Sequence, residues 1–152
     1  MNEPDQTLVM QATAVAIEGR ALLLEGDPGV GKSSLALALI ESGARLIGDD
    51  GVTLSRNDPR PDAVLMASPP PNTRGLIEVR GVGLVTMDVS PPAPVALILS
   101  LTGAGAPEPE RLPHTLAQRE LLGCCVPLLL FCPGAIAPAE RARQALIMHG
   151  LP

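Results

Sequence analysis

The chain has 152 residues, of which 46% are hydrophobic, and it carries a formal net charge of −5 at pH 7. This length is typical of one domain with one hydrophobic core, and the hydrophobic content argues against a disordered chain. The negative charge gives no field that would attract nucleic acid or an anionic membrane. Because Phe131 is the only aromatic residue, the predicted core is aliphatic.

Targeting signals and metal-binding cysteine patterns are not apparent. Met1 to Gln6 is polar and acidic, unlike the basic start of a signal peptide. The longest apolar stretch, Leu121 to Phe131, is too short to span a bilayer. The odd number of cysteines and the lack of C-x-x-C spacing predict buried thiols instead of disulfides or a zinc site. These are Cys124, Cys125 and Cys132. We therefore expect a cytoplasmic protein.

The predicted elements of the first third surround a glycine-rich loop. Thr13 to Ile17 is a predicted strand, and the aliphatic run from Ala21 to Glu25 is typical of a strand buried on both faces. Lys32 to Ser42 is a predicted helix because apolar residues recur at four-residue spacing, and Gly43 ends it. Arg45 to Ile47 is a further short strand.

The rest of the chain is rich in predicted strands. They are Val52 to Ser55, Ala63 to Ala67, Leu76 to Val79, Leu84 to Val89, Val95 to Leu101 and Val126 to Phe131. Asn57-Asp58-Pro59 is a predicted turn and Thr102 to Pro113 a long loop. Thr115 to Leu122 is a predicted short helix, and Pro138 to His149 a closing amphipathic helix with proline near its start. We predict one α/β domain over residues 1–152, with a mixed sheet and few helices.

The loop after the second strand carries a phosphate-binding motif. Residues 26 to 33 read Gly-Asp-Pro-Gly-Val-Gly-Lys-Ser and match G-x-x-x-x-G-K-[ST] at every fixed position. Glycines let the backbone cradle phosphates, and the following helix adds its positive end. The predicted nucleotide-binding residues are Gly26, Asp27, Pro28, Gly29, Val30, Gly31, Lys32, Ser33 and Ser34.

Lys32 and Ser33 have separate predicted roles in this loop. Lys32 reaches the β- and γ-phosphates of ATP, and the Ser33 hydroxyl holds Mg²⁺. Lys32 is also the only lysine in the chain. A glycine-rich turn that merely caps a helix needs neither the lysine nor the hydroxyl, so we favour nucleotide binding.

Two segments that follow the phosphate loop in the sequence indicate which kind of nucleotide-binding protein this is. Residues 48 to 51 read Gly-Asp-Asp-Gly after a short strand, and residues 76 to 84 read Leu-Ile-Glu-Val-Arg-Gly-Val-Gly-Leu. With the phosphate loop, they resemble the HPr kinase/phosphorylase family over about residues 11 to 113. That family has an Asp-Asp pair and then a Glu-x-Arg-Gly-x-Gly segment after its phosphate loop. The chain resembles the family's short form, without a separate N-terminal domain.

The resemblance implies an HPr kinase/PEP carboxykinase-like nucleotide-binding fold and a kinase that phosphorylates a serine of the phosphocarrier protein HPr, with phosphorolysis as the reverse reaction. It also implies a homo-oligomer, a hexamer. From the residues, one of Asp49 and Asp50 is the predicted catalytic base and the other holds Mg²⁺ with Ser33, and the resemblance favours Asp49 as the base and Asp50 as the metal ligand. Glu78 and Arg80 have period-two spacing and share one strand face, where Glu78 is predicted to hold the metal and Arg80 to contact phosphate. From the residues alone, the acidic pair could be a solvated turn, and Glu78 and Arg80 a surface ion pair.

The chain departs from the family at two positions. Gln11-Ala12 stands where the family commonly has His-Gly, and Ser34 stands where it usually has an acidic residue. Glutamine forms hydrogen bonds but cannot carry a proton or a charge. An ATP-sensing module with little or no phosphoryl transfer is therefore the main alternative. A small-molecule kinase or an unrelated NTPase is a further one.

Overall fold

The aliphatic run before the phosphate loop forms the central strand β3 (Arg20–Glu25), and Ala21, Leu22, Leu23 and Leu24 are fully buried. The computed structural model describes residues 6–56, 60, 62–103 and 105–152. β3 pairs antiparallel with β2 (Thr13–Ile17) and parallel with β9 (Ala93–Leu101). This central position explains why the run shows no alternation between apolar and polar residues.

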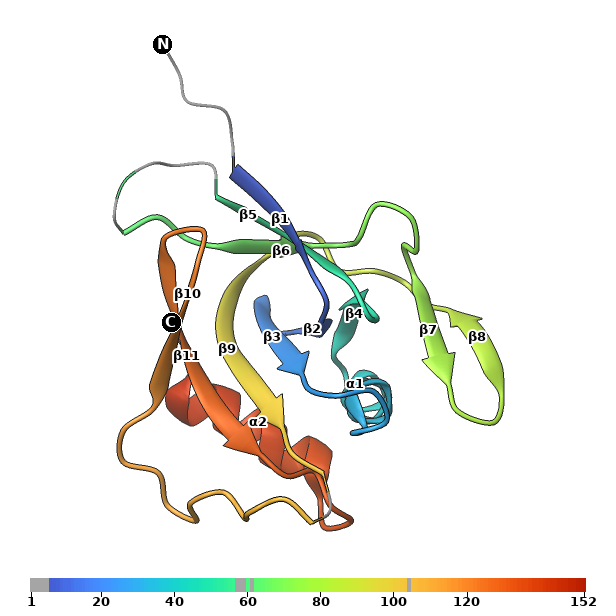
Figure 1. The fold of residues 1–152 in the computed structure, drawn as a ribbon. Coiled ribbons are helices and arrows are strands. Elements are labelled where there is room, and N and C mark those ends of the chain that lie inside the picture. The colour runs from blue at the N-terminus through green and yellow to red at the C-terminus, as the bar shows by residue number, and fades with distance from the viewer. Residues whose placement is uncertain (1–5, 57–59, 61, 104) are drawn as a thin grey trace.

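Nine of the described strands form a mixed sheet in the order β1-β5-β6-β9-β3-β2-β4, with β11 beside β9 and β10 beside β11 (Figure 1). The remaining strands of this sheet are β1 Gln6–Met10, β4 Arg45–Gly48, β5 Val52–Arg56, β6 Met66–Ser68, β10 Ala117–Leu121 and β11 Cys124–Phe131. A separate hairpin is formed by β7 (Leu76–Val79) and β8 (Gly83–Thr86). The predicted α/β fold with a mixed sheet is confirmed.

Two apolar clusters lie on opposite faces of β3. Leu22 and Leu24 pack with the helices α1 (Lys32–Glu41) and α2 (Pro138–His149) in one cluster. Ala21 and Leu23 belong to the other, which includes residues of β5 and β6. Because side chains alternate along a strand, one strand supplies both cores. The helices thus cover one face of the central strands, and the β5–β6 layer covers the other.

Most predicted elements are confirmed, with α2 and β7 at their predicted bounds. The predicted helix from Thr115 to Leu122 is wrong, because Ala117–Leu121 is strand β10, paired with β11. Leu122 and Gly123 both have positive φ, of 52° and 80°, as the tight hairpin turn between β10 and β11 requires. This turn was not predicted from the sequence.

Smaller corrections concern strand ends and cysteines. Strand β6 begins at Met66 instead of Ala63, β8 ends at Thr86 instead of Val89, and β1 was not predicted. The predicted turn at Asn57-Asp58-Pro59 lies outside the described residues. Burial of the thiols is confirmed for Cys124, is wrong for Cys125, which is exposed, and holds only in part for Cys132, which is half-buried. Neither helix in the described part of the chain is long and apolar enough to cross a membrane.

Candidate nucleotide-binding site

The phosphate loop connects β3 to α1 and depends on its glycines. Gly29 and Gly31 have φ of 84° and 108°, values that residues with a side chain rarely adopt. At Gly26, a Cβ atom would lie 2.8 Å from Val30 Cγ1 and 3.0 Å from the Leu101 carbonyl oxygen. Among the described residues no side chain caps the start of α1, so its first N–H groups are available to an anion.

The loop also orients its own lysine. The Lys32 Nζ donates a hydrogen bond to the Gly26 carbonyl at 2.5 Å and a longer one to the Asp27 carbonyl at 3.3 Å. Both acceptors lie within the motif, so the ammonium group is held over the loop by local contacts alone. It is thereby placed on the pocket into which the loop opens.

This pocket has a volume of about 560 Å³ and gathers most of the predicted site residues. Its lining comprises Gln11, Gly26, Pro28, Gly29, Gly31, Lys32, Ser33, Ser34, Asp50, Glu78 and Arg80. Three predicted site residues lie outside the lining. Asp27 accepts the hydrogen bond from Lys32 with its carbonyl, Val30 packs against the core, and Asp49 lies beneath the pocket surface.

Asp49 is the buried centre of the site, with 9% of its surface exposed. Its Oδ1 accepts hydrogen bonds from the Ser33 hydroxyl at 2.6 Å and the Thr13 hydroxyl at 3.0 Å. Its Oδ2 accepts one from the Glu78 backbone N–H at 2.9 Å. Bonds to an ionised carboxylate are strong, and these three connect β2, α1 and β7. Asp49 therefore joins the phosphate loop to the rest of the site.

Asp50 differs from its buried neighbour Asp49 in its exposure to solvent. Its side chain is exposed and lines the pocket, and its backbone takes the left-handed φ of 56°. Glu78 and Arg80 are also exposed on the pocket wall, from β7 and the turn that follows it. No ion pair between these two side chains is present in the described part of the chain.

Ser33 and a carboxylate on the pocket wall could hold a magnesium ion together with the phosphates of a nucleotide. No group of three or more His, Cys, Asp or Glu side chains suited to a metal occurs among the described residues. Mg²⁺ is commonly held by one or two carboxylates together with substrate phosphates, so a complete protein cage is not required. The Ser33 hydroxyl donates a hydrogen bond to Asp49, which leaves the lone pairs of the hydroxyl oxygen free for a cation.

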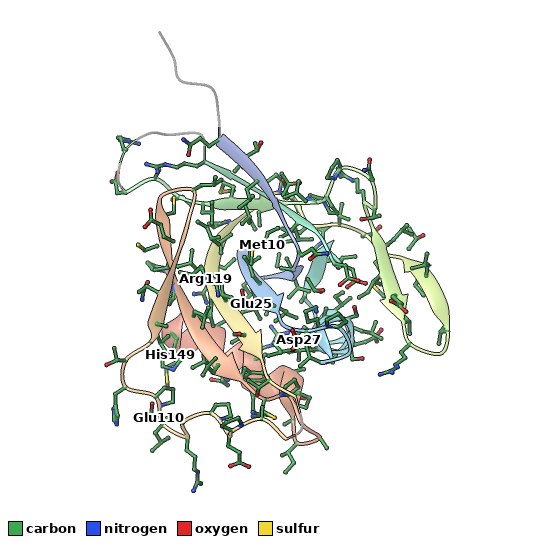
Figure 2. The ribbon with its side chains drawn as sticks, in the orientation of Figure 1. Met10, Glu25, Asp27, Glu110, Arg119 and His149 are labelled. Carbon is green, nitrogen blue, oxygen red and sulfur yellow. The ribbon has the colours of Figure 1, made fainter. Side chains whose placement is uncertain are left out.

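Sequence reasoning missed two contributions to the site. Thr13 was assigned only to a strand, although its hydroxyl reaches Asp49, 36 residues away. Glu25, directly before the phosphate loop, forms a bidentate ion pair with Arg119, with N–O distances of 2.8 and 2.9 Å (Figure 2). The hydrogen bonds with Glu25 raise the pKa of Arg119, against the opposing effect of burial. Neither pairing leaves a signal in the sequence, because the partners are far apart along the chain.

Comparison with known proteins gives a consistent result. The family model of the HPr serine kinase C-terminal domain matches residues 5–130, most of the chain. The HPr kinase/phosphorylase of Lacticaseibacillus casei is 36% identical over 97 residues, which are 64% of this chain and 26% of that protein. That of an Exiguobacterium species is also 36% identical over 97 residues, with 64% and 27% covered. The aligned region spans about a quarter of these relatives.

A solved structure also resembles most of the chain. The Hpr(Ser) kinase/phosphatase of Coxiella burnetii superposes with a TM-score of 0.73 and 26% sequence identity. The match covers 92% of this chain and 92% of that one. The arrangement of strands and helices described above is therefore shared with a structure of the same family.

Proposed function

Because the chain belongs to the family of HPr serine kinase C-terminal domains, we propose that it transfers the γ-phosphoryl group of ATP to a serine of the phosphocarrier protein HPr. Phosphorolysis would remove the group again: inorganic phosphate would attack the phosphoserine, which gives pyrophosphate and free HPr. The observation that carries the proposal is the 2.6 Å hydrogen bond from Ser33 to Asp49, which joins the phosphate loop to the acidic pair. Nucleotide phosphates and a carboxylate next to an incoming hydroxyl can therefore share one pocket.

Phosphoryl transfer depends mainly on positioning and on neutralising charge. Lys32 and the start of α1 would hold the phosphates, together with Arg80, which lines the same pocket. Bound magnesium would neutralise charge between the phosphates, next to Ser33 and a carboxylate. The hydrogen bond from Lys32 to the Gly26 carbonyl keeps its ammonium group beside the loop.

One aspartate would accept the proton of the HPr serine hydroxyl, and the other would hold the metal ion. The family resemblance gives the proton to Asp49 and the metal to Asp50 and Glu78. The hydrogen bonds favour the reverse, because both oxygens of Asp49 are engaged and one of them meets Ser33. Asp50 is the exposed carboxylate that an incoming hydroxyl reaches first. We propose this reversed division.

Transfer to HPr is tested with labelled ATP and purified HPr. We expect label on wild-type HPr and none on HPr whose acceptor serine is replaced by alanine. Lys32→Ala provides the inactive control, because it removes the charge on the phosphates. ATP binding without labelled HPr in the wild-type reaction would contradict the kinase proposal.

The division between the aspartates is tested with Asp49→Asn and Asp50→Asn. Under the reversed division, Asp49→Asn raises the Mg²⁺ concentration needed for half-maximal rate, and saturating Mg²⁺ restores part of the rate. Asp50→Asn loses transfer at every Mg²⁺ concentration, because general base catalysis contributes about 10²–10⁴-fold. The opposite pattern would assign the base to Asp49, and full activity of both variants would mean that neither carboxylate takes part in transfer.

An ATP-sensing module without transfer is a second candidate, because Gln11 lines the pocket where the family commonly has histidine. Tight ATP binding with no turnover on HPr would support it. The family resemblance further implies a cytoplasmic homo-oligomer, a hexamer. Sedimentation of the purified protein tests this state directly, and a monomer at working concentration would contradict it.

A further inference from the structure

Thr13 is an unusual residue for its place in the fold. It lies in β2, whose five residues are all buried, and its own side chain is fully buried. A hydroxyl in such a position is unfavourable unless it is hydrogen-bonded. The Thr13 hydroxyl donates to Asp49 Oδ1 at 3.0 Å, and it accepts a longer, weaker bond from the Asp50 backbone N–H at 3.4 Å.

These bonds connect one hydroxyl to both members of the acidic pair. Asp49 Oδ1 accepts from Thr13 and Ser33 together, so the carboxylate is held in one plane by donors from β2 and α1. Asp50 has a left-handed backbone that is strained for a residue with a side chain, with φ of 56°. The bond from its N–H to Thr13 favours this conformation.

We propose that Thr13 is a positioning residue that holds Asp49 in line with Ser33 and keeps Asp50 turned toward the pocket. The proposal rests on the proposed function, because it assigns Thr13 a task in a metal–nucleotide site. Without this hydroxyl, Asp49 Oδ1 retains only the Ser33 donor, and Asp50 loses its bond to β2. The two carboxylates then sample orientations that do not serve the magnesium–nucleotide complex.

The test compares Thr13→Val, which keeps the shape and removes the hydroxyl, with Thr13→Ser, which keeps the hydroxyl. Calorimetry measures ATP affinity as a function of Mg²⁺ concentration. We expect Thr13→Val to weaken the Mg²⁺-dependent part of binding by about 10-fold or more, the usual effect of losing a hydrogen bond to a metal ligand. Binding without Mg²⁺ stays unchanged, and Thr13→Ser restores the wild-type dependence.

The phosphorylation rate is the second measurement. At saturating ATP and Mg²⁺ we expect a lower kcat for Thr13→Val with little change in the KM for HPr, because the acceptor still binds. A purely structural role would lower the melting temperature but leave the Mg²⁺ dependence and the rate per folded molecule unchanged, and that result would overturn the proposal. If Thr13→Val does not fold, Thr13→Cys replaces it, because a thiol is a weak donor.

Failure of this inference is distinguishable from failure of the kinase proposal. Absence of phosphorylated HPr with the wild-type protein would contradict the kinase proposal, and the calorimetric comparison would still measure the role of Thr13. Wild-type phosphorylation together with equal Mg²⁺ dependence for Thr13→Val and wild type would overturn the role of Thr13 alone.

Discussion

The phosphate loop and the acidic pair border the same pocket, but they are built in different ways. The loop is ordered by neighbours in sequence, and Lys32 bonds to carbonyls five and six residues away. Asp49 is ordered by Thr13, Ser33 and Glu78, which lie 36, 16 and 29 residues away. The geometry of the phosphate loop is therefore set almost entirely by its own residues. The geometry around Asp49, the assembled centre, depends on how strands and a helix pack. The two regions should therefore respond differently to substitution.

Loss of the lysine should have the largest effect, because the loop has no other positive side chain. We expect Lys32→Ala to weaken ATP binding by about 100-fold, close to the 1.5–3 kcal/mol of a hydrogen bond to a charged group. Stability should hardly change, because the side chain is bonded only to its own loop. Calorimetric titration measures the affinity. Arg45→Ala removes the same charge outside the pocket, and an equal loss there would contradict the loop assignment.

The assembled centre should be most sensitive at Gly48, directly before the acidic pair. A Cβ atom there would lie 2.0 Å from the Gly51 carbonyl oxygen and 2.8 Å from Pro70 Cδ, so the backbone must move. We expect Gly48→Ala to lower the free energy of unfolding by about 1–3 kcal/mol, the usual range for overpacking, and to reduce phosphorylation further by moving Asp49. Urea unfolding and the labelled-phosphate assay measure both effects.

Gly51→Ala is the matched control for this change. Gly51 flanks the pair on the other side and is also buried, but a Cβ there would meet Pro70 at 3.4 Å, an ordinary contact. Similar losses in both variants would mean that glycine flexibility, and not the close approach at Gly48, sets the geometry of the acidic pair.

Gln11 lines the pocket that both regions border, and it lies in the segment just before β2. Slow transfer is expected for the parent protein, since glutamine cannot take up a proton. We expect Gln11→His to raise the rate by about 10-fold, part of the 10²–10⁴-fold contribution of acid–base groups. A new limb near neutral pH should appear in the pH–rate profile, where histidine titrates. A fast parent enzyme that histidine does not improve would contradict this role.

The smallest expected effect concerns the ion pair behind the loop. Arg119→Lys keeps the charge but loses the bidentate contact with Glu25. Because Arg119 is 39% exposed, we expect a loss of only about 0.5–1 kcal/mol in the free energy of unfolding. ATP affinity should stay within about twofold, since the loop orders itself. A large loss of ATP affinity would show that β10 supports the loop, and would weaken the contrast between the two regions.

The sequence by itself determined the phosphate loop, the strand before it and the helix after it. Their signals are local: an aliphatic run, fixed glycines, a lysine and a hydroxyl at set spacing. It also identified Asp49, Asp50, Glu78 and Arg80 as candidates, through the resemblance of two short segments to one family. It did not reveal which aspartate is buried, because burial depends on packing against distant strands.

Only the tertiary structure brought Thr13 to the acidic pair and Arg119 to Glu25. Hydrogen bonds between residues so far apart leave no periodicity or spacing in the chain. The same limit explains the error at β10, where pairing with β11 across a two-residue turn outweighed a helix-like pattern. Local chemistry specified the loop that we propose to bind phosphates, and long-range packing decided which carboxylate is buried behind it and which faces the pocket.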